Sequence, residues 1–335
     1  MIRRANDAGA ELRPHMKTHQ SVTVARWFRE RGVDAATVSS PAMALYFAKD
    51  GWKDITIAFP FYRAMIENLK NLEEVCRIRL FINSVEDLDY LEHNLTQPFN
   101  YYIEIDPGYG RSGISYENSS LINRLARYKS SSGQALFHGF YIHEGRTYQA
   151  KGLSEIEKRI TPALSLLKNL RSDFPDSAIS IGDTPSCSVS KQLDVIDEMT
   201  PGNFVFYDYM QYQIGSCSLD DVALFAKLPI AQASNSAGRT ILNGGAAHLS
   251  KDYIRKPDIP TFGRIVRISA DRIETVGNAH IRSLSQEHAI VDGLNDLPDA
   301  ATHVWVCPIH SCLTANLFSE YRTLSGGTIK KRILS

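Results

Sequence analysis

The stretch Arg13-Pro14-His15-Met16-Lys17-Thr18-His19 lies close to the start of the chain. Read as a strand, it would place Arg13, His15, Lys17 and His19 on one face, because side chains alternate along an extended backbone. Burying a lysine ammonium is costly, so Lys17 must either pair with an anion or be kept neutral and reactive. Lysine Schiff-base chemistry needs the second condition. The alternative interpretation is that these residues lie on the surface of an edge strand.

Composition places the chain among ordinary globular proteins. With 335 residues, 43% hydrophobic and 22% charged, it is long enough for two domains with a large core. Lys+Arg and Asp+Glu both number 37, so nothing favours nucleic acid or an anionic membrane as a partner. Five irregularly spaced cysteines argue against a disulfide framework. No apolar run has transmembrane length, and residues 1–20 lack the apolar core of a signal peptide, so we expect a cytoplasmic protein.

Strand-like and helix-like segments alternate over residues 1–215. The strand candidates are residues 11–18, 35–40, 54–60, 79–84, 101–106, 136–143, 178–182 and 203–208. The helix candidates include residues 2–10, 24–31, 63–71, 86–94, 121–129 and 155–173, which carry apolar residues at helical spacing. Eight strands alternating with helices predict an α/β fold of the (β/α)8 TIM-barrel type, with a doubly wound open sheet as the alternative.

The pattern changes in the remainder of the chain. Strand-like runs at 264–269, 272–276, 289–291 and 303–307 are separated by Gly, Pro and Asp turns, and helix signals are scarce. We therefore expect a barrel domain over residues 1–215 and a mostly-β domain over residues 216–335.

Polar residues follow several predicted barrel strands, at the end where such barrels carry their chemistry. The fifth strand leads into a glycine-rich loop with Arg111, and the sixth into His143 and Tyr148. After the seventh, Gly182-Asp183-Thr184-Pro185-Ser186 offers hydroxyls and backbone N–H groups suited to a phosphate, and Thr200-Pro201-Gly202-Asn203 makes a turn beside it. Solvated loops, a helix cap and a β-turn would explain these residues without a ligand.

His310-Ser311-Cys312 is the sharpest local signal in the second domain. In an extended segment this spacing puts the imidazole and the thiolate on one side, where they could bind zinc or another divalent cation. Two protein ligands leave coordination positions open, as in catalytic metal sites. The alternative is a buried cysteine next to a half-exposed histidine.

Together these motifs resemble the pyridoxal-phosphate enzymes with an alanine-racemase-like barrel, in the branch of D-serine dehydratase, D-threonine aldolase and D-threo-3-hydroxyaspartate dehydratase. The resemblance runs in order from the lysine motif to residues 303–317 and covers nearly the whole chain. It implies that Lys17 carries pyridoxal 5'-phosphate and that Arg111 lies by its phenolic oxygen. It further implies that the cofactor ring is lined by His143 and Tyr148, the phosphate is held by Thr184, Ser186, Gly202 and Asn203, and the metal by His310 and Cys312.

The sequence departs from the family pattern at two places. Members normally begin with a Thr-Pro-Ala-like strand well before the lysine motif, whereas only residues 2–10 precede it here, so the chain looks N-terminally short. Alanine racemases place an Arg before the Pro-Gly turn to contact the pyridine nitrogen, and Thr200 stands there in this chain. The absence of that charge argues against simple racemisation.

The resemblance implies a dehydratase that converts a D-amino acid with a β-hydroxyl, D-serine-like, to a 2-oxo acid and ammonia. Lys17 would remove the Cα proton, and the metal would act as a Lewis acid on the β-hydroxyl. The alternatives are a retro-aldol lyase of the D-threonine aldolase type, whose members tend to have Asp in place of Cys312, an amino-acid racemase, and a non-catalytic pyridoxal-phosphate-binding protein. A head-to-tail homodimer is expected, in which the β domain of one subunit closes the barrel of the other.

Overall fold

The computed structural model describes residues 1–233, 237–256, 259–269, 272–295 and 300–332. Two compact units make up the chain: residues 1–202 together with the segment from Ile329 onward, and residues 203–328. This division comes earlier than the boundary expected after residue 215. The last residues, which we assigned to the second domain, group with the first unit.

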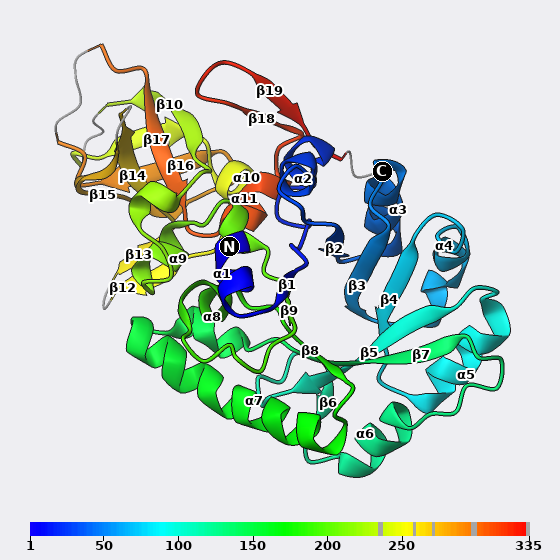
Figure 1. Cartoon of the computed structure of the whole chain (residues 1–335). Helices are drawn as coiled ribbons and strands as arrows, with labels where there is room; N and C mark the ends of the chain where they lie inside the picture. Colours follow the sequence, from blue (N-terminus) through cyan, green and yellow to red (C-terminus); the bar gives the residue numbers. More distant parts are fainter. Residues whose placement is uncertain (234–236, 257–258, 270–271, 296–299, 333–335) are drawn as a thin grey trace. The chain divides into compact units, whose positions relative to one another are not determined.

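The first unit is a parallel barrel of eight strands, as predicted (Figure 1). The strands are β1 (Glu11–Leu12), β2 (Ala35–Val38), β3 (Asp54–Pro60), β4 (Arg77–Phe81), β5 (Phe99–Asp106), β7 (Ala135–Ile142), β8 (Ala178–Ile181) and β9 (Glu198–Met199). They pair in the order β1-β9-β8-β7-β5-β4-β3-β2, and β6 (Ile114–Ser115) adds to β5. A parallel bridge between His15 and Thr37 joins the chain after β1 to β2 and closes the circle.

Helices connect the strands and surround them in Figure 1. They are α1 (Ile2–Asp7), α2 (Val22–Arg29), α3 (Pro41–Lys49), η1 (Arg63–Met65), α4 (Ile66–Lys70), α5 (Val85–Asn94), α6 (Ser119–Ala126), η2 (Gly145–Gln149), α7 (Leu153–Asp173) and α8 (Thr184–Val189). Several begin at a side-chain cap: Ser40 accepts from Met43 N at the start of α3, and Ser84 accepts from Asp87 N at the start of α5. The core strands are buried on nearly every residue, as is usual for parallel sheets covered by helices.

The predicted first strand is shorter than expected. The extended pairing continues beyond β1, with Arg13 N donating to Met199 O (2.8 Å) and Met16 N to Thr37 O (2.8 Å). Gln20 N then donates to Met16 O (2.9 Å), so the backbone turns directly after Met16. The prediction that Arg13, Lys17 and their alternate neighbours share one face is therefore wrong, because the alternation of a strand ends before Lys17 is reached.

The predicted eighth strand, residues 203–208, is also wrong. The eighth barrel strand is β9, which ends before the Thr200-Pro201-Gly202 turn, and residues 203–205 form a 3-10 turn, η3 (Asn203–Val205). Phe206 N and Tyr207 N both donate to Asn203 O, at 3.0 and 2.7 Å. An apolar run such as Phe204-Val205-Phe206 fits a strand or a helical turn equally well, and here the local hydrogen bonds select the turn.

A buried ion network occupies the strand starts of the barrel. Arg79 pairs with Glu198 (2.6 Å) and with Asp54 (2.7 Å), and the fully buried Arg13 also pairs with Asp54. Burial disfavours ionisation, but the paired guanidinium groups hold the pKa of Asp54 at about 2. For Glu198 burial is again opposed, by a hydrogen bond with His138 and the same two arginines, and its pKa is about 2. Arg13 thus belongs to the barrel interior and not beside Lys17.

The second unit contains a closed antiparallel barrel of six strands, in the order β10-β11-β16-β15-β14-β17. These are β10 (Ala226–Gln232), β11 (Thr240–Asn243), β14 (Gly263–Ile268), β15 (Ile273–Leu284), β16 (His288–Asp292) and β17 (His303–Pro308). Leu228, Leu242, Ile265, Ile281 and Val306 fill its core. The prediction of a mostly-β second domain is confirmed.

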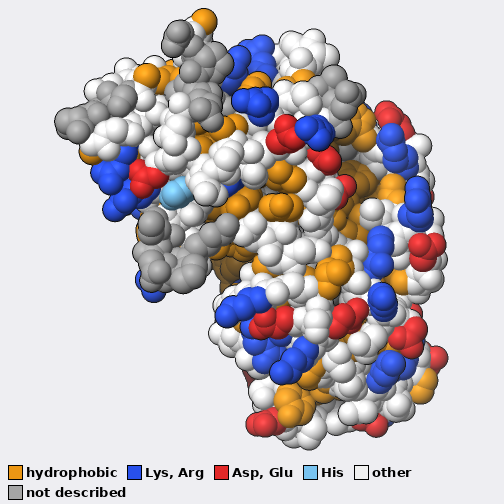
Figure 2. Space-filling model, turned by 90° about the vertical axis from the view of Figure 1, so that its left-hand side faces the viewer, with side chains coloured by type: hydrophobic (Ala, Val, Ile, Leu, Met, Phe, Trp, Pro, Cys, Tyr) orange, Lys and Arg blue, Asp and Glu red, His pale blue; other side chains and the backbone are white. Residues whose placement is uncertain are grey.

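Short elements complete the chain. They are α9 (Tyr209–Gln213), η4 (Leu219–Asp221), α10 (Ala246–Leu249), β12 (Ile254–Lys256), β13 (Ile259–Thr261), α11 (Ser311–Asn316), β18 (Glu320–Arg322) and β19 (Thr328–Lys330). Among the described residues, no helix combines the length and the apolar character needed to cross a bilayer. On the face presented in Figure 2, Lys and Arg side chains lie among Asp and Glu side chains, in keeping with the balanced formal charge.

Candidate functional site

Lys17 follows the end of the first barrel strand, the position where parallel barrels carry reactive groups. Its side chain is exposed, whereas its neighbours His15, Thr18 and His19 are buried. Lys17 N lies 3.4 Å from His15 Nδ1. The lysine is therefore presented at the strand C-terminal side of the barrel on an otherwise buried turn.

Two buried imidazoles lie in the electrostatic field of Lys17. Burial, followed by the positive charges of Lys17 and other basic groups, holds the pKa of His15 well below its ordinary value. Burial and the charges of Arg111 and Lys17 do the same to the pKa of His143. Both rings are consequently neutral near pH 7. Because these charges act on the same rings, Lys17, Arg111, His15 and His143 occupy one neighbourhood.

The loops after β5 and β7 bring the predicted Arg111, His143 and Tyr148 to this neighbourhood. The ring centroids of His143 and Tyr148 are 6.1 Å apart, and their planes are inclined by 23°. In the loop after β5, Asp106 Oδ1 accepts from the backbone N–H groups of Gly108 (3.0 Å), Tyr109 (2.8 Å) and Gly110 (3.1 Å). This carboxylate orders the loop that carries Arg111.

Thr184 and Ser186 open the segment after β8, and Asp183 caps it by accepting from Ser186 N (2.9 Å). The hydroxyls of Thr184 and Ser186 are fully buried. The Ser186 hydroxyl lies beside the Asp183 carboxylate and helps to lower its pKa against the effect of burial, whereas the Thr184 hydroxyl has no hydrogen-bond partner. Buried hydroxyls are normally hydrogen-bonded, so the Thr184 hydroxyl indicates a polar ligand. Thr184 N donates to Tyr148 Oη (3.1 Å), which joins the pair to the His143 neighbourhood.

Glycines follow β8 and β9 where a side chain would not fit. A Cβ on Gly182 would lie 1.9 Å from Tyr141 Oη, and one on Gly202 would lie 2.8 Å from Thr18 Oγ1. Glycine at both positions lets the two turns pack against the barrel and against the turn after Lys17. Lys17, Arg111, His143, Tyr148, Thr184, Ser186 and Gly202 are thus brought together within the first unit.

Sequence reasoning gave no role to His15, although it stands in the lysine motif. Its ring is 5% exposed, and Nε2 has no hydrogen-bond partner. A neutral imidazole with a free buried nitrogen next to Lys17 can accept or donate one hydrogen bond to a ligand. Its position two residues before the lysine was the available signal.

The predicted metal pair lies in the second unit. His310 is the N-cap residue of α11 and Cys312 lies in its first turn, so the segment is helical and not extended as expected. Burial would lower the pKa of His310, but hydrogen bonds with Asp252 and Cys312 raise it to about 10. The side chains of His310 and Cys312 are therefore in contact, because the first turn of a helix can also bring together residues two positions apart.

Asn203, predicted to hold the phosphate, groups with the second unit. Its Nδ2 donates to Asp208 Oδ2 (2.7 Å) and Ser311 Oγ (3.1 Å) and lies 3.6 Å from Cys312 Sγ. Asn203 therefore supports one of the two predicted metal ligands, and its contact with a phosphate stays a prediction. Within the described ranges, no three His, Cys, Asp or Glu side chains cluster closely enough to hold a metal.

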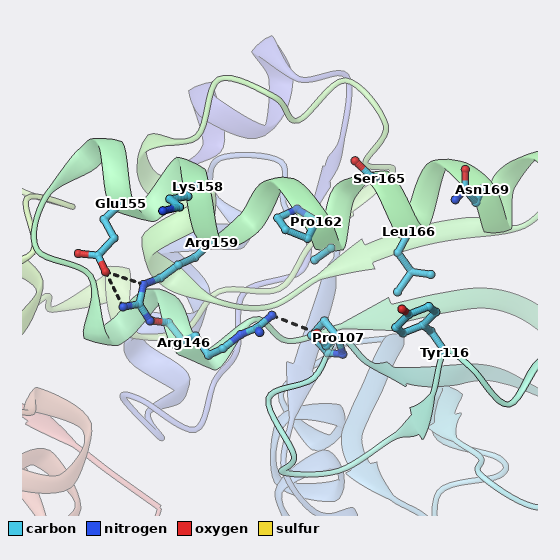
Figure 3. A pocket seen from close by; sticks show the side chains of 11 residues that line it. Pro107, Tyr116, Arg146, Glu155, Lys158, Arg159, Pro162, Ser165, Leu166 and Asn169 are labelled. Carbon is cyan, nitrogen blue, oxygen red and sulfur yellow. Dashed lines mark hydrogen bonds and ion pairs between the residues drawn. The ribbon is translucent and has the colours of Figure 1, made fainter.

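A cavity of about 800 Å³ lies along α7 (Figure 3). It is lined by residues of α7 and of neighbouring loops, and none of the predicted site residues lines it. Arg146 and Arg159 line it, but Arg146 pairs with Glu144 and donates to Pro107 O (3.0 Å), and Arg159 pairs with Glu155. These guanidinium groups are thus already compensated, and nothing indicates a ligand here.

Comparisons with known proteins match both units. Residues 1–209 match the family described as alanine racemase, N-terminal domain, and residues 230–324 match the "Putative serine dehydratase domain". The chain is 27% identical to D-serine dehydratase from Dictyostelium discoideum, over 97% of this chain and 89% of that protein. It is 26% identical to D-threo-3-hydroxyaspartate dehydratase from Delftia sp. (strain HT23), over 97% of this chain and 90% of that protein.

Solved structures share the fold. The Delftia sp. HT23 enzyme superposes with a TM-score of 0.83 at 24% identity, covering 98% of this chain and 92% of that chain. A cysteine-to-alanine mutant of D-threo-3-hydroxyaspartate dehydratase, in a metal-free form, gives a TM-score of 0.81 at 23% identity, covering 98% of this chain and 92% of that chain. The likeness extends over both units of the chain.

Proposed function

The chain belongs to the family of the alanine racemase N-terminal domain, and on this premise we propose that it is a pyridoxal-phosphate- and metal-dependent dehydratase. Its substrate is a D-amino acid with a β-hydroxyl, D-serine-like, and its products are a 2-oxo acid and ammonia. The observation that carries the proposal is the His310–Cys312 pair, because racemisation needs no second electrophile. The names of the relatives, D-serine dehydratase and D-threo-3-hydroxyaspartate dehydratase, support it.

The first unit fits pyridoxal phosphate. The buried hydroxyls of Thr184, which has no partner, and of Ser186 would hold the phosphate, and the stacked His143 and Tyr148 rings would line the cofactor ring. When bound through Lys17, the cofactor supplies an electron sink for charge that develops at Cα of an amino acid. The neutral state of His15 and His143 keeps further positive charge away from Lys17.

Lys17 is the group that moves the proton. The amine Nζ of Lys17 would take the proton from Cα of the bound amino acid. The β-hydroxyl would leave with that proton as water, and the released enamine would hydrolyse to the 2-oxo acid and ammonia. Arg111 would bind the phenolic oxygen of the cofactor, as the resemblance implies.

The second unit fits a soft or borderline divalent cation, because an imidazole and a thiol are the donors that zinc prefers. When bound to His310 and Cys312, the metal supplies a Lewis acid for the departing hydroxyl. The metal-free form of a cysteine-to-alanine mutant among the structural neighbours supports a metal that depends on a cysteine.

A head-to-tail homodimer is part of the proposal. A carbanion must be shielded from water, and Lys17 is exposed in the single chain. The β domain of one subunit would cover the barrel of the other. Specific activity should then fall on dilution, at protein concentrations where sedimentation detects monomer. A monomer with undiminished activity contradicts this part alone.

The test is a screen of D-serine, D-threonine and D-threo-3-hydroxyaspartate for release of 2-oxo acid and of aldehyde, with L-serine as the control for stereochemistry. We expect 2-oxo acid and ammonia in equal amounts from a D-substrate. Treatment with a chelator should stop release while the cofactor absorbance persists, and added zinc should restore it. Aldehyde as the main product would favour a retro-aldol lyase, and racemised substrate without release would favour a racemase.

A further inference from the structure

His310 has a partner outside its own helix. Its Nδ1 lies 3.0 Å from Asp252 Oδ2, although the two residues are 58 positions apart in the chain. A histidine has two ring nitrogens, so this contact leaves Nε2 as the nitrogen that can bind a metal. Nothing in the sequence around Asp252 marks it as part of a site.

We infer that Asp252 is a positioning residue for the metal: its carboxylate fixes the tautomer and ring orientation of His310 so that Nε2 receives the cation. The inference deepens the proposed function and rests on its assignment of His310 and Cys312. A carboxylate behind a ligating histidine also makes the imidazole a better donor. Asp252 supports the site and does not ligate, because within the described part of the chain no three such side chains converge on one point.

The turn that carries Asp252 is itself held in place. Asp252 N donates to Ser250 Oγ (3.2 Å), and Tyr253 N donates to Asp252 Oδ1 (3.2 Å), which leaves Oδ2 for His310. Ser250 has a φ of 68°, a left-handed conformation that is rare outside glycine. These local contacts fix the direction of the carboxylate before any metal binds.

A second contact joins the same two segments. Thr314, on α11 two residues beyond Cys312, donates its hydroxyl hydrogen to Leu249 O (3.2 Å), at the end of α10. Asp252 and its turn are therefore anchored to the helix that carries the metal pair at two points. This geometry distinguishes Asp252 from a carboxylate that meets a histidine by chance on a surface.

The experiment measures zinc affinity of the full chain carrying its cofactor, by competition with a coloured chelator. Asp252→Ala should weaken zinc binding by roughly 10- to 100-fold, the usual effect of losing such a partner. Asp252→Asn keeps an oxygen that can accept from Nδ1 and should lose less. The cofactor absorbance should not change in either variant. Asp252→Ala with native zinc affinity would overturn the inference.

Asp292→Asn is the matched control. Asp292 lies on β16 in the same unit and forms ion pairs with Arg239 and Arg282. Its substitution should leave zinc affinity unchanged. His310→Ala distinguishes a failure of the proposed function from a failure of the inference about Asp252. If His310→Ala keeps native zinc affinity, the metal assignment and the proposed function with it are wrong. If His310→Ala loses zinc affinity while both Asp252 variants keep it, only the role of Asp252 is wrong. The visible spectrum of the cobalt-substituted protein, which reports ligand geometry, should shift in Asp252→Asn and stay native in Asp292→Asn.

Discussion

The cofactor residues of the first unit and the metal pair of the second are built in opposite ways. The first set comes from turns after five different barrel strands, from Lys17 to Gly202, and only the barrel brings its members together. His310 and Cys312 are neighbours in the chain, on one short helix start. The distant contribution to the metal pair is a support, Asp252, and not a ligand.

The two regions also differ in how their polar atoms are satisfied. The hydroxyl of Thr184 is buried without a partner before any ligand binds, whereas His310 is already bonded to Asp252 and Cys312. The barrel thus leaves a buried hydrogen-bonding group unpaired, and a cofactor can bind to it without breaking a contact within the protein. A metal must instead replace the contact between its two ligands. The difference predicts that the regions respond independently to mutation.

Lys17→Ala should have the largest effect on activity. Loss of a positioned proton-transfer group typically costs roughly 10²- to 10⁴-fold in rate, and loss of the covalent attachment adds to it. In the native protein, the near-ultraviolet or visible absorbance of the bound cofactor should disappear on borohydride treatment. The variant should show no such borohydride-reducible absorbance. Zinc content, measured by metal analysis, should stay native. A borohydride-reducible chromophore in the variant would remove the assignment of Lys17.

Glu198→Gln should have the largest effect on stability. Removing one partner of a buried ion pair costs about 3–5 kcal/mol in free energy of unfolding, and the cost should lie towards the lower end of this range because Arg79 keeps its pair with Asp54. Denaturant titration followed by fluorescence can detect it, since Trp27 and Trp52 lie in the first unit and Trp305 in the second. Unchanged zinc affinity in the folded variant would support the independence of the regions.

The Glu198 carboxylate also predicts that the free energy of unfolding falls in acid. The pKa of Glu198 is lowered from 4.5 to about 2 in the folded protein, so ionised Glu198 stabilises the fold above pH 4.5. This stabilisation is lost as the pH falls from 4.5 towards 2. Glu198→Gln should therefore flatten the dependence of unfolding free energy on pH over that window. An unaltered slope would mean that Glu198 is not ionised within the network.

Thr184→Val and Ser186→Ala should weaken cofactor binding, and Thr184→Val should do so without weakening the cofactor-free fold. A hydrogen bond to a charged group contributes about 1.5–3 kcal/mol, so each change should raise the Kd for pyridoxal phosphate by roughly 10- to 100-fold. Because the Thr184 hydroxyl has no protein partner, the melting temperature of cofactor-free Thr184→Val should not fall, whereas Ser186→Ala also loses a contact with Asp183. Ser188→Ala, on the same short helix, serves as the comparison for binding. Tight cofactor binding by both variants would contradict the phosphate assignment.

Cys312→Asp should have the smallest effect, because it keeps a ligand and changes its hardness. Metal preference should move from zinc towards manganese, and the product ratio should move towards aldehyde. Competition between the two metals, followed by product analysis, measures both. Cofactor absorbance should not respond, as expected if the regions act separately. An unchanged metal preference would count against Cys312 as a ligand.

The alternation of strands and helices was readable in the sequence, because parallel strands buried on both faces leave apolar runs separated by helical periodicity. Strand β3 was predicted at the bounds it has, and the turns after β5, β7 and β8 carry the polar residues expected of them. Residues 203–208 were misread as a strand because a short apolar run has no decisive period. Arg13 was wrongly predicted to lie on the same face as Lys17, because the alternation of side chains holds only if the strand continues as far as Lys17.

The sequence by itself determined which residues come to the ends of the barrel strands and that His310 and Cys312 meet, because both follow from local order along the chain. The tertiary structure decided which groups stay unsatisfied and which are supported. Whether the Thr184 hydroxyl is buried without a partner depends on what packs around it. The contact of Asp252 with His310 joins segments far apart in the chain, and no local pattern encodes such a contact because it exists only once the backbone between them has folded.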